Sequence, residues 1–252
     1  MMIFQELGAG LLFLREVFRT ILKNSVNRSA LFQQIYLVTT QALVTTAFSG
    51  FFVGAIMSVQ FNSQLKEFGA LSVLGGLATS ATIRELGPLL IAFMLSGKIG
   101  AYTSAELGTM RVTEQIDAIR CLGTDPIEYL VLPRFLAIII SSFILLFAGL
   151  LMSILGGVTL GQLVAGMSPQ EYLNAIPHFV TASSVFIGLF KCFCFSFLLA
   201  SICTFKGYYT KGGAKGVGRT VITTALSTMV GIVLVDWFTS YLSRAVGNLW
   251  SS

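Results

Sequence analysis

Charged residues are scarce in this chain of 252 residues: Asp, Glu, Lys and Arg make up 11% of it, whereas hydrophobic residues make up 55%. A soluble domain carries about 25% charged residues, which coat its water-facing surface. Together with a mean hydropathy of +0.83, this composition excludes a soluble enzyme, a nucleic-acid-binding domain and a disordered tail. The net charge of +5 points to no nucleic-acid partner, because the basic residues are spread between apolar runs. We therefore predict an integral membrane protein.

Histidine and cysteine are also too few for most catalytic or metal sites. His178 is the single histidine, so the sequence offers no histidine-based metal site or catalytic relay. The cysteines, Cys121, Cys192, Cys194 and Cys203, sit in or beside apolar stretches without metal-ligand spacing, and we interpret them as small packing residues. The scattered acids form no catalytic constellation, which disfavours a membrane-embedded lipid-modifying enzyme. We predict a protein that is not an enzyme and holds no metal or cofactor.

Long apolar runs predict five membrane-spanning helices, since about 20 residues cross a bilayer. The predicted spans are residues 35–61, 71–97, 135–163, 180–205 and 217–242. The sequence GMSP at 166–169 breaks the apolar stretch between the third and fourth spans, and a short loop containing Pro177 is expected there. Asp236 is the single acid of the fifth span. The predicted fold is all-α.

Lys and Arg in the short flanks orient these spans, because they are enriched on the cytoplasmic side. Twelve fall on the side of the N-terminus and two, Lys66 and Arg244, on the other, while Arg84 and Lys191 lie within spans. The twelve are Arg15, Arg19, Lys23, Arg28, Lys98, Arg111, Arg120, Arg134, Lys206, Lys211, Lys215 and Arg219. We therefore expect a multi-pass protein with a cytoplasmic N-terminus and a C-terminus on the opposite side.

Residues 1–28 are predicted to contain an amphipathic helix that precedes the first span, and residues 29–252 to form the transmembrane domain. The apolar residues of this amphipathic helix repeat at helical spacing, and cations line another face. The apolar residues are Phe4, Leu7, Leu11, Leu14, Phe18 and Ile21, and the cations are Arg15, Arg19 and Lys23. Such a helix lies in the membrane interface; the alternative is a helix packed on the bundle. It is not expected to be a cleavable signal, because Glu6 precedes a short apolar run and the cations follow it.

Two adjacent charges, Arg84 and Glu85, interrupt the second span. Each costs about 2.5–3.5 kcal/mol at a helix centre unless it is paired or faces a polar cavity. Neighbouring residues point about 100° apart on a helix and cannot pair well with each other, so at least one needs another partner. Pro88 follows and can kink the helix. The pattern fits a site for a polar headgroup or an ion; an interhelical ion pair is the structural alternative.

A stripe of Met57, Phe61, Leu65 and Phe68 lies on one face of the first span, at positions i, i+4, i+8 and i+11. Alone it indicates packing or lipid contact, but beside Arg84 it becomes a candidate wall for the acyl chains of an amphiphile. Two small-residue motifs, Gly50/Gly54 and Gly157/Gly161, allow close helix packing.

The connection at residues 98–134 contains a short helix, predicted at about 113–122, with Thr113 as N-cap and Glu114 in the first turn. Gly123 and the Asp125-Pro126 pair end it. With Ile116, Ile119 and acidic groups exposed, it could dock in a groove of a soluble partner or simply close the connection.

The glycine-rich run at 212–219, GGAKGVGR, lacks the spacing of a phosphate-binding loop. We expect a flexible cytoplasmic turn. The chain has no nucleotide-hydrolysing apparatus of its own, so active transport would draw on a partner or an ion gradient.

Three segments together resemble a known family: RELGP at 84–88, GKIG at 97–100 and AELGTMRVTEQIDA at 105–118. They are similar to the MlaE-type (YrbE-like) permeases of Mce-associated phospholipid ABC transporters, and the resemblance runs from the N-terminal helix through the fifth span. Lys98 stands where many relatives carry arginine, which keeps the charge.

The resemblance implies a homodimer that moves phospholipid between the bacterial inner membrane and a periplasmic Mce-domain carrier, a hexamer, and so maintains outer-membrane lipid asymmetry. It also implies a cytoplasmic ABC ATPase dimer that binds the ATP, and a STAS-domain accessory protein. The helix after Val112 would be the coupling helix that meets the ATPase. Its candidate coupling residues are Arg111, Thr113, Glu114, Gln115, Asp117 and Arg120. The candidate lipid-binding residues are Met57, Phe61, Leu65, Phe68, Arg84 and Glu85.

An ion-coupled secondary transporter or channel that uses Arg84, Glu85 and Asp236 is the alternative function. Many such folds are built from repeated halves, and this sequence shows no internal repeat, which favours the permease.

Overall fold

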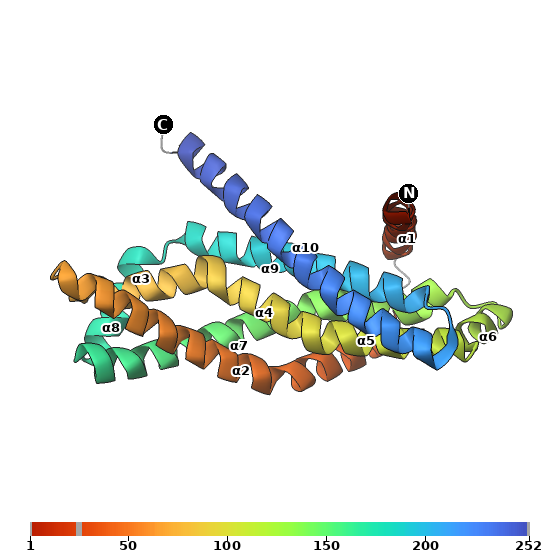
Figure 1. The fold of residues 1–252 in the computed structure, drawn as a ribbon, viewed down its shortest axis with the longest axis horizontal. Coiled ribbons are helices and arrows are strands. Elements are labelled where there is room, and N and C mark those ends of the chain that lie inside the picture. The colour runs from red at the N-terminus through yellow and green to blue at the C-terminus, as the bar shows by residue number, and fades with distance from the viewer. Residues whose placement is uncertain (1, 24–26, 251–252) are drawn as a thin grey trace. The chain divides into compact units, whose positions relative to one another are not determined.

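Helices make up almost the whole chain in the computed structural model, which describes residues 2–23 and 27–250, without the side chains of residues 2–7, 244 and 246–250. No strand occurs among the described residues. In chain order the elements (Figure 1) are α1 (Met2–Leu22), α2 (Arg28–Glu67), η1 (Leu71–Val73), α3 (Leu74–Ala81), η2 (Thr82–Leu86), α4 (Gly87–Leu95), η3 (Ser96–Gly100), α5 (Ala101–Val112), α6 (Gln115–Cys121), η4 (Ile127–Val131), α7 (Leu132–Ala165), α8 (Pro169–Phe179), α9 (Ala182–Tyr208) and α10 (Gly213–Trp250).

Five of these helical segments are long and apolar enough to cross a membrane, which confirms the predicted all-α membrane fold. They are Arg28–Glu67, Leu71–Val112, Ile127–Ala165, Ala182–Tyr208 and Gly213–Ser243. Each is longer than the apolar run that predicted it, because the bilayer sets only the minimum length of a span and the helix can continue into the flanking sequence.

Three expected connections are wrong, and each is helical instead. The second span continues through η3 and α5 to Val112, so residues 98–112 belong to a helix. The expected loop around Pro177 is α8, which begins with Pro169 at N1 and a capping box between Ser168 and Glu171. The glycine-rich run is not a flexible turn, since α10 begins at Gly213.

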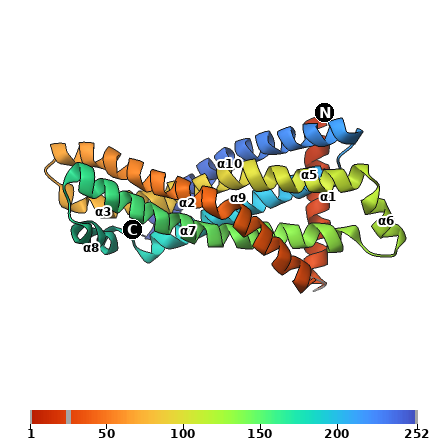
Figure 2. The same cartoon turned by 90° about the horizontal axis from the view of Figure 1, so that it is seen from below.

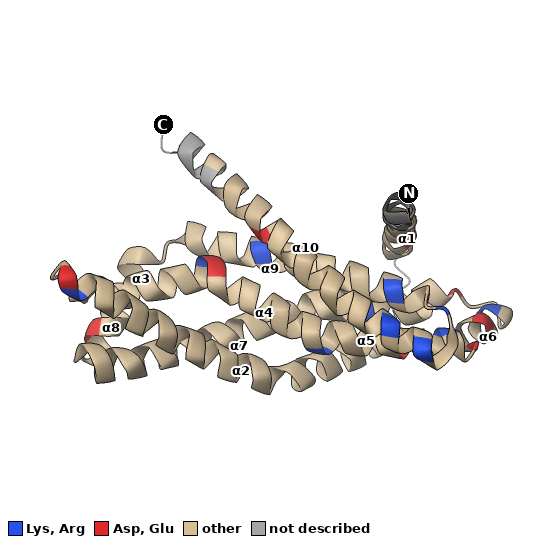
Figure 3. Cartoon of the chain, in the orientation of Figure 1, with Lys and Arg blue, Asp and Glu red and all other residues tan. Residues whose placement is uncertain are grey.

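The chain forms two compact units. Unit 1 consists of Met1–Gln41, Leu95–Ser141 and Ser196–Val235, and unit 2 of Ala42–Met94, Ser142–Phe195 and Asp236–Ser252. Each of the five spans has residues in both units. The twelve Lys and Arg residues that the sequence places on the side of the N-terminus all belong to unit 1, and Figure 3 shows Lys and Arg gathered around α5 and α6. Arg244 lies outside the described side chains.

Unit 2 is held together by glycines that let α2 and α7 touch. A Cβ atom at Gly54 would lie 1.8 Å from the carbonyl oxygen of Ser153, so the first small-residue motif does mark a close approach. At the second motif, Gly157 makes room for the Tyr172 ring of α8, whose hydroxyl group hydrogen-bonds Ser58 at 3.1 Å. At Gly54 the missing Cβ lets one backbone pack against another, and at Gly157 it makes room for an aromatic side chain.

In unit 1, α1 lies across the direction of the long helices (Figures 1 and 2) and presents two apolar faces. Phe13 and Val17 are buried, and Phe13 packs against aromatic rings at the end of α9. Leu11, Phe18 and Leu22 are exposed. The two interpretations of this segment therefore describe two faces of one helix, one packed on the bundle and one free for the membrane interface. The side chains of Phe4 and Leu7 lie outside the described part of the chain.

Candidate functional site

Lys191 of α9 is fully buried and lies at the centre of a charged cluster in unit 2. Its ammonium group donates to Asp236 at 2.9 Å and to the Ser240 hydroxyl at 2.6 Å, both on α10. It also pairs with Glu85 of η2, and Ser240 hydrogen-bonds the same carboxylate at 3.3 Å. Two carboxylates and a hydroxyl group thus surround one cation, the arrangement that a buried charge needs in a span. The sequence left open whether one of the adjacent charges forms an interhelical ion pair. Glu85 does so, with Lys191 of α9.

The backbone at Glu85 is a single π-helical turn, η2, between α3 and α4. Pro88 has no N–H group, so the carbonyl of Arg84 receives no α-helical hydrogen bond from it. The N–H group of Gly87 bonds to the carbonyl of Thr82, five residues back, which is the π-helical pattern. Turns of this kind are common at functional sites because they change the direction in which neighbouring side chains point. The proline predicted to disturb the helix does so by widening one turn.

Arg84 is exposed and makes no hydrogen bond or ion pair within the described residues. Its neighbour Glu85 is committed to Lys191, and Asp236 is committed as well. Among the described residues, no anion therefore accompanies this guanidinium group, which lies in the middle of a membrane-spanning segment. Arginine binds phosphate and carboxylate groups through paired hydrogen bonds, so this position can hold an anionic headgroup.

The predicted apolar stripe on α2 is divided between a packed part and an exposed part. Phe61 and Leu65 pack against a small core formed by Leu74, Met167 and Tyr172. Met57 is half-buried and Phe68 is 81% exposed. The neighbouring face of α2 lines an apolar groove of about 580 Å³ that includes Phe52, Ile56 and Val59. Sequence spacing identified the helix and missed the face on which the groove lies.

The predicted coupling helix exists as α6, but it begins later than expected. Thr113 is not its N-cap: the Thr113 hydroxyl donates to the Thr109 carbonyl and closes α5. Glu114 takes the N-cap place in a left-handed conformation, with φ of 61° and no side-chain cap. The predicted end is correct, since Gly123 follows with φ of 78°. A reversal of the chain at Glu114 therefore separates α5 from α6.

The side chains at α6 divide into a set that fixes the helix to unit 1 and an exposed set, in which Gln115 contacts only its neighbour Thr113. Ile116 is fully buried, not exposed as the sequence suggested. Asp117 accepts a hydrogen bond from Arg111 at 2.7 Å, and Arg120 donates to the Tyr208 hydroxyl at 3.0 Å. Glu114 and Gln115 are exposed. The candidate residues that fix α6 to its unit are thus distinct from those available to a partner.

Two charged contacts were not anticipated from the sequence. Lys191 was recognised within a span, but nothing assigned it to Glu85 and Asp236. In unit 1, the buried Arg134 binds both carboxylate oxygens of Glu106, at 2.9 and 3.1 Å. A basic residue within one span and an acidic residue within another are the sequence signal for such pairs. The register of the helices decides which acid the basic side chain reaches.

The cysteines largely behave as predicted. Cys192 and Cys203 are buried and Cys194 is half-buried, in keeping with a packing role. Cys121, at the end of α6, is exposed; for this residue the packing interpretation is wrong.

These features define a polytopic helical membrane protein with a charged cluster inside its spans and a short exposed helix between two of them. The model of the family described as Permease MlaE matches residues 31–242. A probable ABC transporter permease protein of Synechocystis sp. is 34% identical over 95% of this chain and 91% of its own length. One of Rickettsia felis is 33% identical over 94% of this chain and 92% of its own length, and one of Porphyra purpurea is 33% identical over 86% and 82%.

The chain therefore belongs to the MlaE permease family. It is a transmembrane permease of the ABC-transporter type.

Proposed function

We propose that this permease moves phospholipids between the bacterial inner membrane and a periplasmic Mce-domain carrier, powered by a separate cytoplasmic ATPase dimer. A second copy of the chain completes the lipid pathway, and a STAS-domain accessory protein joins the assembly. The transport maintains lipid asymmetry of the outer membrane. The N-terminus and α6 face the cytoplasm and the C-terminus faces the periplasm.

The observation that carries the proposal is the free guanidinium group of Arg84 at membrane depth. A cation there is costly unless an anion accompanies it, and its neighbouring carboxylate is already paired with Lys191. A phosphate group that enters from the lipid would meet this requirement, while its acyl chains stay in apolar surroundings such as the groove along Phe52 and Ile56. Glu85, held by Lys191, would position Arg84.

The coupling role of α6 is supported by this division into residues that fix the helix and exposed residues. Because Ile116, Asp117 and Arg120 fix α6 to unit 1, a push on the exposed Glu114 and Gln115 would move the helices to which α6 is attached. Short helices of this kind dock in a groove of a soluble partner.

Charge reversal at Glu114 tests this contact. We expect Glu114→Lys to reduce co-purification of the ATPase subunit at least several-fold, because it places a cation at the exposed start of α6. Glu67→Lys, a reversal at an exposed acid at the end of α2, is the matched control and should leave assembly unchanged. Equal recovery of the ATPase with both variants would remove α6 from the coupling interface.

A further inference from the structure

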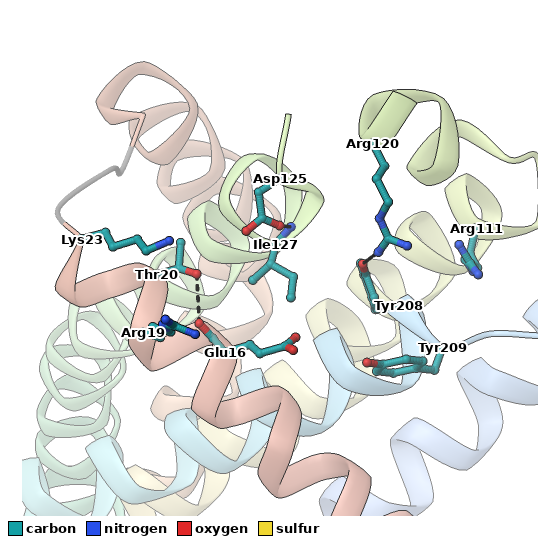
Figure 4. Close-up of a pocket in the computed structure, with 10 residues that line it drawn as sticks. All are labelled: Glu16, Arg19, Thr20, Lys23, Arg111, Arg120, Asp125, Ile127, Tyr208 and Tyr209. Carbon is teal, nitrogen blue, oxygen red and sulfur yellow. Dashed lines mark hydrogen bonds between the residues drawn. The ribbon is translucent and has the colours of Figure 1, made fainter. Parts of the chain in front are cut away.

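A second charged hollow lies in unit 1, between α1, the region of α6 and the end of α9 (Figure 4). Its volume is about 530 Å³. Four cationic side chains, Arg19, Lys23, Arg111 and Arg120, line it. It is separate from Arg84, which belongs to unit 2.

The cations of the hollow are only partly neutralised. Arg111 is paired with Asp117, which lies outside the lining, and Arg120 contacts a neutral hydroxyl group. The side chains of Arg19 and Lys23 make no hydrogen bond or ion pair within the described residues. Uncompensated cations gathered around one space favour an anion within it.

Two carboxylates share the lining, Glu16 and Asp125. Asp125 accepts the backbone N–H of Ile127 at 3.0 Å and is partly committed to that turn. Glu16 has no side-chain partner among the described residues, and Figure 4 shows it directed toward Tyr209. A free acceptor beside several donors suits a ligand that carries both a phosphate and hydroxyl groups.

Tyrosine hydroxyl groups add neutral donors. Partial burial, followed by the nearby Glu16 carboxylate, raises the pKa of Tyr209 above its ordinary value. The hydroxyl group therefore stays protonated at neutral pH and can donate a hydrogen bond. Guanidinium groups and hydroxyl donors together match the oxygens of a phosphate group.

The exposed face of α1 indicates that the phosphate group belongs to a lipid. The helix that contains Arg19 and ends just before Lys23 exposes Leu11, Phe18 and Leu22. Exposure of these side chains to water is unfavourable, whereas a bilayer interface would bury them. Basic pockets at this level of a membrane protein bind the headgroups of anionic lipids.

We propose that this hollow binds the headgroup of an anionic glycerophospholipid, such as phosphatidylglycerol, from the leaflet on the α6 side. Its phosphate contacts Arg19, Lys23 and Arg120, and its glycerol hydroxyl groups donate to Glu16. Since Glu16 and Arg19 belong to α1, Lys23 directly follows it and Arg120 belongs to α6, the bound lipid holds α6 against the interfacial helix. The proposal depends on membrane insertion and not on which lipid is transported.

Native mass spectrometry of the purified full-length protein with its co-purifying partners tests the proposal, because it counts bound lipids. The probes are short-chain phosphatidylglycerol, phosphatidylcholine and inorganic phosphate. The variant is Arg19→Gln/Lys23→Gln. The matched control is Arg15→Gln/Arg28→Gln, which removes two exposed cations from the same part of the chain but outside the hollow.

We expect the variant to bind one phosphatidylglycerol fewer, or to bind it about thirtyfold more weakly, than wild type and control, since it removes two surface cations that contribute about 1 kcal/mol each. Phosphatidylcholine should show no such difference. Equal phosphatidylglycerol binding by both double variants would overturn the proposal. So would inorganic phosphate that binds as tightly as the lipid, which would indicate a free-phosphate site. Loss of the ATPase with unchanged lipid binding would assign the hollow to an acidic protein surface instead.

Discussion

At the scale of single residues, Lys191 poses the largest electrostatic problem of unit 2. Its side chain is 1% exposed, whereas those of Glu85 and Asp236 are 47% and 25% exposed. The cation depends on the two carboxylates, while each carboxylate keeps some access to its surroundings. Removal of the lysine and removal of the acids should therefore have different consequences.

We expect Lys191→Met to lower stability by about 3 kcal/mol, because it leaves two carboxylates without their cation inside a span. The estimate lies at the lower end for a broken buried pair since both acids are partly exposed. Thermal unfolding of the detergent-purified protein measures the change. The triple variant Lys191→Met/Glu85→Gln/Asp236→Asn, whose cluster is neutral, should recover much of the lost stability. If it unfolds at a lower temperature than Lys191→Met alone, charge pairing is not what stabilises the cluster.

The sequence predicts that the charges of the cluster need partners, but not which residues those partners are. Adjacent charges show that Arg84 and Glu85 cannot satisfy each other, and this was correct. The identity of the partner depends on the register of η2, α9 and α10, which no local pattern contains. The burial of Ile116 was missed for the same reason, because no local pattern records how α6 packs against the rest of unit 1.

At the scale of helices, small residues determine how closely two backbones approach. Gly54 faces the backbone of Ser153, and Gly50 faces that of Gly149, where a Cβ atom would lie 2.4 Å from a carbonyl oxygen. Backbone atoms cannot turn aside as a flexible side chain can, so a methyl group must push α2 and α7 apart.

Gly54→Ala should therefore destabilise the protein by about 1–3 kcal/mol, the usual cost of overpacking, although alanine is the better helix former. Gly97→Ala is the matched control, because nothing lies within 4 Å of a Cβ atom there. It should be neutral or stabilise by up to about 1 kcal/mol. The two variants are compared by thermal unfolding in the same detergent, and a Gly54→Ala protein as stable as Gly97→Ala would contradict the packing.

Helix existence was easier to predict than helix ends. Apolar runs revealed all five spans, since the bilayer imposes a minimum length. The ends were missed where glycine or proline suggested a break: η3 continues through GKIG, α8 contains Pro177, and α10 begins within the glycine-rich run. In these places tertiary packing or a π-helical turn satisfies the backbone, and local propensity is overridden.

At the scale of the whole molecule, the distribution of Lys and Arg predicts which side of the membrane α6 faces. Cys121 is exposed at the end of α6, while Cys192 and Cys203 are buried and Cys194 is half-buried within the span Ala182–Tyr208, so Cys121 is the thiol most open to a water-soluble reagent. The same distribution predicts that the connection containing α8, with the exposed Asn174, faces the other side of the membrane.

With a cytoplasmic α6, a membrane-impermeant maleimide should leave Cys121 unlabelled in intact spheroplasts and label it in inside-out vesicles. Asn174→Cys in a Cys121→Ser background should show the reverse pattern. The measurement is the labelled fraction on a gel. Labelling of Cys121 in intact spheroplasts would invert the topology and place α6 away from any cytoplasmic ATPase.

Phospholipid movement by the reconstituted permease and its ATPase tests the central claim most directly. Labelled phospholipid is followed between proteoliposomes and the carrier, with ATP or with a proton gradient alone. The account predicts ATP-dependent transfer that Arg84→Gln reduces at least tenfold and that Arg84→Lys partly retains, with thermal stability unchanged, because Arg84 has no partner within the described chain. Wild-type transfer by Arg84→Gln, or transfer driven by the proton gradient without ATP, would contradict it.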